Sequence, residues 1–430
     1  MAQIKTLNGF RDFAPEDCAV RNYIFATWRN VAKRFGFVEY EVPVVESSEL
    51  YLKKSGGEIA GQLFRFEDQG GRDISIRPEV TPSLARLVAA RQREFQKPMK
   101  WFQMGQCFRY ERPQKGRLRE FYQYNVDLIG EESLEADIEL ISLSIEVMRE
   151  LGFVVGDFVV RLSHRGAWQK FCADHALESE EQVTAFMSVI DKWEKLNEEK
   201  LNAELSPFGL EYAQVQRFID EGATSTPEIE QILAGLEQRG LGEFVKVDLA
   251  IVRGLAYYTG TVFEVFDLQH NMRAIAGGGR YDELIKTLSD GASDLPVIGF
   301  GMGDVVLRNL IEATPQALLK MKSALAQDTV CDVYLVIADE EQRGNAGAVA
   351  MQLRHEGIKV DYPLAKAKMG KQFQKAEQLG ARYAIVIGSE FPMLQVKNLN
   401  ERREETCKYS ESFALDMKDK LSSFDTGILA

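Results

Sequence analysis

The sequence predicts an α+β fold, in which a core built on an antiparallel sheet carries a helical insertion and precedes a C-terminal α/β domain. Strand-like stretches flank a polar loop in residues 99–129, which is typical of a long β-hairpin. Residues 166–245 show helical periodicity and few strand signals. From about residue 330, strand and helix signals alternate, which favours a mostly parallel sheet.

The first elements follow from local signals. Apolar residues at helical spacing predict a helix over residues 16–35, ending at Gly36. The stretch FVEYEVPVV predicts a strand in which Pro43 lies at an edge or an end, because proline donates no hydrogen bond to a sheet. Two short strands joined by a QGGR turn are expected within residues 61–77, and a helix over residues 81–94.

Strand signals return after the insertion, in VKVDLAIVRGLAYYTGTVFEVFD, and a strand-to-helix passage follows in PVIGFGMGDVVLRNLI. The polar stretch around residues 313–329 contains Pro315 and is the best linker candidate. We therefore expect four parts: residues 1–165 form the first part of the core, 166–245 the insertion, 246–325 the second part of the core, and 330–430 the C-terminal domain.

Composition limits the functional class. The 430 residues are 45% hydrophobic and 27% charged, which is ordinary for globular proteins and excludes collagen-like and disordered chains. The N-terminal residues hold no apolar segment of a signal peptide, and no apolar run reaches the roughly 18 residues of a membrane span. The 5 cysteines are far apart and the 4 histidines form no cluster with them, so reduced thiols and no zinc site are expected. We predict a cytoplasmic protein with no membrane partner.

The charge is unevenly distributed. The net charge of −13 argues, as an average, against a nucleic-acid partner. However, the insertion holds six basic and sixteen acidic residues, whereas residues 97–121 hold seven basic residues and only two acidic ones. A local basic site of this kind suits a ligand that carries phosphate. The alternative is a hairpin edge that its charges protect from aggregation.

The strongest chemical pattern lies on the predicted hairpin. Arg109 and Glu111 are two residues apart and therefore share one face of a strand, as do Phe121 and Gln123 on the return strand. The planar fork of an arginine matches the oxygens of a phosphate, and a glutamate can hold such a fork or accept from the amino group of a base. A cross-strand salt bridge is the alternative for the Arg/Glu pair.

Two further segments carry polar groups that could meet a ligand. In IVRGLAYYTG, Arg253 could lie near a phosphate, with Tyr257 and Tyr258 near a polar ligand, although strand tyrosines are more often half-buried packing. In RPEVT, Glu79 and Thr81 could receive an ammonium group, although proline and glutamate before a helix are also ordinary capping chemistry.

Taken in order along the chain, these segments resemble the histidyl-tRNA synthetase family of class II aminoacyl-tRNA synthetases. GFRDFAPED resembles the opening of the family's chain, the helix with GFVEYEVPVVE resembles class motif 1, and FRYERPQKGRLREFYQYNVD resembles class motif 2. IVRGLAYYTGTVFE and AGGGRYD are similar to two histidine-specific boxes. The resemblance covers nearly the whole chain and implies a class II catalytic core with a C-terminal anticodon-binding domain.

The resemblance implies a two-step reaction. Histidine and ATP first give histidyl-adenylate and pyrophosphate, and the histidyl group then passes to the 3′-terminal adenosine of tRNA(His). ATP is expected as its Mg²⁺ complex, for which the sequence names no protein ligand, and zinc is not expected. Motif 1 implies a homodimer.

The resemblance also implies roles for individual residues. Arg109 and Arg253 are the expected catalytic residues and hold the α-phosphate from two sides, while Glu111 and Arg117 contact ATP with Arg109. The expected histidine-binding residues are Glu79, Thr81, Gln123, Asp127, Arg253, Tyr257, Tyr258 and Tyr281. Those expected at the tRNA acceptor end are Gln114, Lys115 and Arg117. In the C-terminal domain, tRNA phosphates could meet Lys366, Lys368, Lys371 and Lys375, or these lysines form a solvated helix face.

Two positions depart from the family's pattern. Class motif 3 usually ends in an arginine that grips ATP, where this chain has Val305. We hypothesise that Arg308, one helical turn later, replaces that arginine. The second departure is Ala256, where the histidine-specific box usually has aspartate.

Three other functions are weighed against the synthetase. The regulatory subunit of ATP phosphoribosyltransferase shares the core fold and senses histidine, but it lacks the anticodon-binding domain and the intact catalytic boxes. Another class II synthetase, such as a threonyl or prolyl enzyme, is opposed by the RGLAYYTG and GGGRYD boxes. The third alternative is an RNA-binding protein with a basic patch, which would bind RNA but would not catalyse pyrophosphate exchange.

Overall fold

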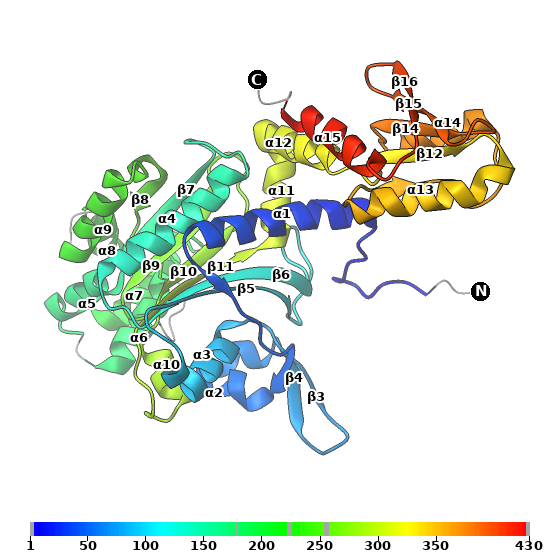
Figure 1. Cartoon of the computed structure of the whole chain (residues 1–430). Helices are drawn as coiled ribbons and strands as arrows, with labels where there is room; N and C mark the ends of the chain where they lie inside the picture. Colours follow the sequence, from blue (N-terminus) through cyan, green and yellow to red (C-terminus); the bar gives the residue numbers. More distant parts are fainter. Residues whose placement is uncertain (1–3, 178, 222–225, 253–257, 427–430) are drawn as a thin grey trace. The chain divides into compact units, whose positions relative to one another are not determined.

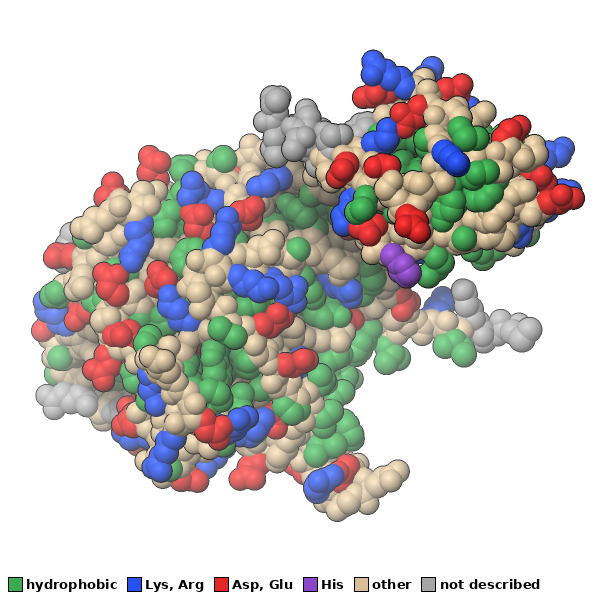
Figure 2. Space-filling view, viewed as in Figure 1, with side chains coloured by type: hydrophobic (Ala, Val, Ile, Leu, Met, Phe, Trp, Pro, Cys, Tyr) green, Lys and Arg blue, Asp and Glu red, His purple; other side chains and the backbone are tan. Residues whose placement is uncertain are grey.

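The computed structural model describes residues 4–177, 179–221, 226–252 and 258–426 (Figure 1). The chain divides into two compact units, Met1–Lys322 and Ser323–Ala430. Each unit has a sheet and a hydrophobic core of its own. Figure 2 shows acidic and basic side chains interspersed over the visible face of the molecule.

An eight-stranded sheet forms the centre of the first unit. In spatial order its strands are β1 (Val38–Glu39), β5 (Met99–Phe108), β6 (Glu120–Ile129), β11 (Val297–Gly303), β10 (Ala276–Arg280), β9 (Thr261–Asp267), β7 (Phe158–His164) and β8 (Val245–Val247). Every pairing from β5 to β7 is antiparallel, and the two edge strands pair in parallel. The predicted antiparallel core is confirmed, and β5 with β6 is the expected hairpin.

Long helices cover one face of this sheet (Figure 1). Helix α4 (Leu134–Glu150) lies on β6, β9, β10 and β11, with α1 (Pro15–Arg34) beside it. Helix α1 begins with proline and acidic residues and ends with basic residues, which is favourable for the helix dipole. Its fully buried Trp28 stacks on Tyr124 of β6 with ring centroids 5.1 Å apart. Helix α11 (Asp304–Ala313) also contacts β6.

A smaller group of elements packs together around α3. It consists of α2 (Ser48–Ala60), α3 (Thr81–Arg91), α10 (Glu283–Leu288) and a three-stranded sheet of β2 (Val45–Ser47), β4 (Asp73–Ile76) and β3 (Phe64–Glu67). Leu84 and Val88 of α3 share a buried cluster with Ile129 of β6 and Leu284 of α10. This packing fixes the start of α3 against the large sheet.

The stretch FVEYEVPVV differs from the single strand that was expected. It forms β1 and β2, which belong to different sheets, with Pro43 between them. Because proline supplies no N–H to a ladder, the chain leaves one sheet before Pro43 and joins the other after it.

The segment between β7 and β8 is helical, as predicted. Its helices are α5 (Arg165–Asp174), α6 (Glu180–Ile190), α7 (Glu198–Leu205), α8 (Tyr212–Glu221) and α9 (Pro227–Gln238). An aromatic cluster binds α5, α6 and α8 together: the Trp168 ring lies 5.8 Å from Phe186 and 5.1 Å from Phe218, centroid to centroid. The four-part division of the chain stays a prediction.

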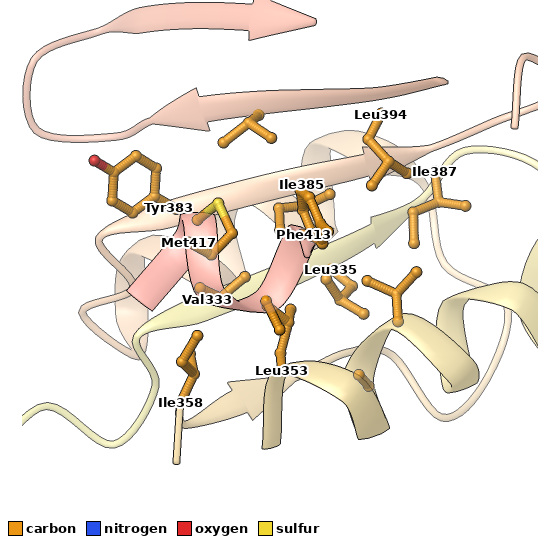
Figure 3. Close-up of a cluster of buried hydrophobic side chains, with 14 of the residues drawn as sticks. Val333, Leu335, Leu353, Ile358, Tyr383, Ile385, Ile387, Leu394, Phe413 and Met417 are labelled. Atoms are coloured by element: carbon orange, nitrogen blue, oxygen red, sulfur yellow. The ribbon is translucent and has the colours of Figure 1, made fainter. Parts of the chain in front are cut away.

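The second unit is an α/β domain. Its sheet has the order β13 (Val360–Asp361), β12 (Val333–Ile337), β14 (Tyr383–Ile387), β15 (Met393–Asn398) and β16 (Arg403–Lys408). The first three strands are parallel, as expected, whereas β15 and β16 add antiparallel pairings. The helices of this unit are α13 (Arg343–His355), α14 (Met369–Gln378) and α15 (Phe413–Thr426). Figure 3 shows Leu335, Ile385, Leu353 and Phe413 in its core.

The stretch predicted as a linker is helical. Helix α12 (Pro315–Gln327) begins with Pro315, where the missing N–H of proline leaves no hydrogen bond unmade. The boundary between the two compact units falls within this helix. Among the described residues, no helix combines the length and apolar character needed to cross a membrane.

Candidate active site

Two adjoining cavities lie in the first unit. The larger has a volume of about 540 Å³ and the smaller about 130 Å³. Arg109, Gln123 and Gly301 line both of them. A ligand group at this junction is therefore within reach of molecules bound on either side.

The small cavity collects six of the eight predicted histidine-binding residues. It is lined by Glu79, Thr81, Arg109, Gln123, Asn125, Asp127, Tyr258, Gly277, Tyr281, Gly299, Phe300 and Gly301. These residues come from β6, β10, β11, the start of α3 and the segments beside β9 and α10. The antiparallel register places Gly299 of β11 opposite Asp127 of β6, so distant parts of the chain meet here.

Glycines on β11 make room for the polar side chains of β6. A Cβ atom at Gly299 would collide with the carboxylate of Asp127, and one at Gly301 would collide with the amide of Gln123. Neither glycine has a positive φ, so space rather than backbone conformation requires glycine here.

Asp127 and Tyr281 form a buried pair at the base of this cavity. Asp127 is 1% exposed and Tyr281 is 3% exposed, and the Tyr281 hydroxyl donates a hydrogen bond to Asp127 Oδ1. Burial, with a further contribution from Asp127, raises the pKa of the neighbouring Tyr40 hydroxyl well above its usual value. A carboxylate held in such a place is a strong acceptor for a ligand N–H.

A buried thiol supports Gln123. Cys107 Sγ lies 3.7 Å from Gln123 Oε1 and donates to it. Burial raises the pKa of Cys107 to about 12, so the thiol stays protonated near neutral pH and can act as this donor. The contact fixes the amide oxygen of Gln123 toward β5.

The large cavity brings together the predicted ATP-binding residues Arg109, Glu111 and Arg117. Arg109 Nε donates to the carbonyl oxygen of Pro78 at 3.0 Å, and the guanidinium lies 5.2 Å from the centroid of the Phe121 ring. These two contacts hold Arg109 at the junction of the cavities. Its guanidinium is therefore presented in a fixed orientation.

Glu111 holds an arginine. The two side chains form an ion pair, in which Arg117 Nη2 donates to Glu111 Oε1 at 2.6 Å. Of the two roles expected for Glu111, an adenine contact or an arginine brace, the ligand-free arrangement has the brace.

The turn between β5 and β6 carries Gln114 and Lys115. The backbone N–H and C=O groups of Gln114 and Arg117 bond reciprocally at 2.9 Å, and Gly116 adopts φ +76° in this tight turn. Lys115 is exposed. The side-chain oxygen of Gln114 accepts a hydrogen bond from Arg273 Nη2 at 2.8 Å.

The structure gives no support to the hypothesis that Arg308 replaces the arginine of motif 3. Val305 and Val306 line the large cavity, but Arg308 does not. Its guanidinium pairs instead with Asp17 of α1 and Glu312 of α11, each at 2.9 Å. Two carboxylates outside the cavity therefore determine the direction of this side chain, although its helical position is one turn from Val305.

Asp304, the acidic residue before Val305, holds neighbouring segments together. Asp304 is 4% exposed, pairs with Arg11 at 2.8 Å and accepts from the backbone N–H of Tyr122 at 2.8 Å. Burial raises the pKa of Asp304, and Arg11 counteracts this increase. The aspartate thereby joins the N-terminal segment, β6 and α11.

Several cavity residues were not found by sequence reasoning. Glu264 of β9 and Arg273, between β9 and β10, line the large cavity. The helical insertion contributes Asp191, Glu194 and Lys195 to the same wall. Glu264 is the last residue of the box IVRGLAYYTGTVFE, and Arg273 lies between the two boxes, but neither was assigned a role because a single charged residue gives no local signal of its own.

Arg253, Ala256 and Tyr257 lie outside the described residues. Their described neighbours are at the site, because Val252 lines the large cavity and Tyr258 the small one. In the second unit the four candidate lysines Lys366, Lys368, Lys371 and Lys375 are all exposed. Among the described residues, no group of three or more His, Cys, Asp or Glu side chains could hold a metal ion.

Comparisons with known proteins match both units. A family model described as histidyl-tRNA synthetase matches residues 9–303, and one described as an anticodon binding domain matches residues 332–415. The chain is 41% identical over 429 residues to a histidine–tRNA ligase of Opitutus terrae, covering 95% of each chain.

Solved structures agree with this match. The histidyl-tRNA synthetase of Nostoc sp. PCC 7120 has a TM-score of 0.77 at 27% identity, covering 98% of this chain and 100% of that one. A Bacillus halodurans structure, titled as an ATP phosphoribosyltransferase regulatory subunit/histidyl-tRNA synthetase, has a TM-score of 0.71 at 23% identity, covering 90% and 99%. At that identity the second likeness shows the fold alone.

Proposed function

The chain belongs to the histidyl-tRNA synthetase family, and from its two joined cavities we propose how it attaches histidine to tRNA(His). Histidine occupies the small cavity and ATP the large one. The observation that carries this assignment is that Arg109 lines both. The regulatory-subunit alternative is opposed by the anticodon-binding match at residues 332–415.

Activation takes place at the junction of the cavities. A carboxylate oxygen of histidine attacks the α-phosphorus of ATP, the bond from that phosphorus to the bridging oxygen breaks, and pyrophosphate leaves. Nucleotidyl transfer needs little covalent help from protein, so positioning and positive charge provide the catalysis. Arg109 stabilises the charge that develops on the α-phosphate. Arg253 is proposed to act on the same phosphate from the other side.

The small cavity selects histidine by its polar groups. We assign Glu79, Thr81 and Gln123 to the α-ammonium group, and the imidazole to Asp127, with Tyr257, Tyr258 and Tyr281 around it. One imidazole nitrogen donates and the other accepts, so both need partners in a buried site. An apolar analogue would leave the Asp127 carboxylate without its ligand partner and is therefore rejected.

The large cavity holds the nucleotide. Glu111 and Arg117 are assigned to ATP, and ion pairing between them sets the position of Arg117 before ATP arrives. Mg²⁺ that enters with ATP shields the charge of the phosphates and needs few protein ligands, which fits the carboxylates present.

In the second step, a ribose hydroxyl of the 3′-terminal adenosine attacks the carbonyl carbon of histidyl-adenylate, and AMP leaves. The exposed hairpin turn with Gln114, Lys115 and Arg117 is assigned to the tRNA acceptor end. The anticodon-binding domain of the second unit is assigned to the anticodon, with the exposed lysines before and on α14 contacting phosphates.

We propose that the enzyme is a cytoplasmic homodimer. Exposed apolar side chains around β2 and β3 support an interface there: Val44, Val45 and Phe66 are 40%, 45% and 47% exposed. Apolar side chains gathered in this way are typical of a surface that another protein covers.

Arg109→Ala tests the assignment of the junction. Loss of its guanidinium removes charge stabilisation in the transition state, so histidine-dependent pyrophosphate exchange should fall by about a hundredfold or more. Binding of histidine alone, measured by calorimetry, should change little. An exchange rate within about threefold of the wild type, in a variant with an unchanged circular dichroism spectrum, would contradict the role of Arg109.

A further inference from the structure

We propose that Arg273 binds the outer phosphates of ATP, and thereby supplies the positive charge that the valines at the start of α11 do not provide. The inference rests on the proposed function only in assigning ATP to the large cavity. Nothing in the sequence patterns singled out this residue. It follows from the place of Arg273 in the cavity wall and from the ion pairs of the other charged side chains there.

Arg273 lies where the hairpin turn meets α11. Its side chain is exposed and lines the large cavity. A Cβ atom built on Gly116 would lie 3.9 Å from Arg273 Cδ and 3.3 Å from Val306 Cγ2. Arg273, the turn and the first residues of α11 therefore form one continuous part of the wall. Val305 and Val306 are uncharged, so positive charge at this place comes from Arg273.

The other cations of the wall are largely neutralised by carboxylates. Arg117 is paired with Glu111, and Lys195 with Asp191. By contrast, Arg109 and Arg273 bond to neutral oxygens, the carbonyl of Pro78 and the side-chain amide of Gln114. Among the described cations of this wall, these two arginines therefore offer their charge to a triphosphate most directly.

The two arginines lie at places that suit different phosphates of the triphosphate. Arg109 lines both cavities and therefore serves the α-phosphate, which must meet the carboxylate of histidine. Arg273 lines the large cavity and is not among the residues that line the small one. The β- and γ-phosphates extend away from the reacting carboxylate, and a guanidinium fork matches their oxygens.

Binding of ATP and of AMP to the full-length protein, without histidine, separates phosphate contact from other roles. We compare Arg273→Ala and Arg273→Gln, measured by calorimetry. The glutamine can keep a hydrogen bond to Gln114 but carries no charge. Both variants should bind ATP roughly tenfold to a hundredfold more weakly, as expected for a lost charge-assisted hydrogen bond, and AMP within about twofold of the wild type.

A third variant and a control complete the test. Arg273→Lys keeps the charge without the fork and should fall between the wild type and Arg273→Ala. Arg308→Ala is the matched control, because that arginine is paired with Asp17 and Glu312 outside the cavity, and its affinities should not change.

Three results would overturn the proposal. Equal losses for ATP and AMP would place Arg273 at the adenine or ribose. An ATP affinity of Arg273→Gln equal to that of the wild type would show that Arg273 acts by holding the hairpin turn through Gln114 and not by its charge. An unchanged ATP affinity in all three Arg273 variants would remove it from the site. Failure of the proposed function is distinct, because it appears as absent histidine-dependent exchange in the wild type.

Discussion

Asp127 combines burial with a fixed hydrogen-bond partner, and for this reason we propose that amino-acid selection depends on it most. Its Oδ1 atom accepts from the Tyr281 hydroxyl, and the glycine at position 299 leaves the space in front of it open. We propose that this carboxylate accepts a hydrogen bond from an imidazole N–H of the bound histidine.

Asp127→Asn should raise the KM for histidine by roughly tenfold or more, because a charged acceptor in a buried site is replaced by a neutral one. The near-identical shape of asparagine preserves the packing. Histidine-dependent pyrophosphate exchange at varied histidine concentration measures this effect. Tyr281→Phe should change the KM in the same direction but less, and the KM for ATP should stay constant in both. A histidine KM equal to that of the wild type in Asp127→Asn would remove Asp127 from the imidazole site.

At the scale of elements, β7 passes directly into the helical insertion through an N-cap. His164 Nδ1 accepts a hydrogen bond from the backbone N–H of Gly166 at 3.1 Å, at the start of α5. Burial lowers the pKa of His164, while Glu228 and Asp137 oppose that effect. The cap needs an unprotonated nitrogen, so a low pKa and the capping role support each other.

This cap makes the stability of the fold sensitive to pH. The unfolded chain binds a proton at a pKa near 6.5, whereas the folded chain binds it only at lower pH, so the free energy of unfolding decreases as the pH falls below about 6.5. His164→Asn keeps a capping oxygen that does not titrate, and it should therefore lose less stability than the wild type as the pH falls. Denaturant unfolding of both proteins at about pH 8 and about pH 5 tests this. Identical losses in the two proteins would contradict it.

The sequence specified most elements because their signals are local. The 3.6-residue period of α1 and the alternation in β5 and β6 led to the correct assignments, whereas Pro43 lies between two strands and not within the single strand that was expected. Helix α2 was not predicted, since its sequence SELYLKKSGGEIA contains two adjacent glycines that oppose helix formation. Strand β16 and helix α15 were also missed.

At the scale of the whole molecule, residues that are distant in sequence meet through the strand register. Asp127, Tyr281 and Glu79 lie in separate segments, and the resemblance to a family was needed to group them before the structure placed them around one cavity. Arg273 was beyond that reasoning, because its importance comes from the neighbours Gln114 and Val306. The ion pair of Arg308 with Asp17 could not be foreseen for the same reason, since the two residues are far apart in the sequence.

Assembly is also a property of the whole molecule. The proposed homodimer should have twice the mass of the 48.6 kDa chain in light scattering at micromolar concentration. Phe66→Asp should shift it toward the monomer, because a charge on the exposed face of β3 opposes burial in an interface. Arg93→Asp, an exposed charge reversal outside β2 and β3, serves as the control. A wild-type chain that is monomeric while fully active would contradict the proposal.

The two joined cavities are proposed to activate histidine with ATP. The most direct test is exchange of labelled pyrophosphate into ATP, without tRNA, with each of the twenty amino acids supplied separately. Exchange is expected with histidine and with no other amino acid, because the small cavity is assigned polar partners for both a donor and an acceptor nitrogen. Absence of exchange with every amino acid, while histidine still binds, would contradict it and would indicate a histidine-sensing protein.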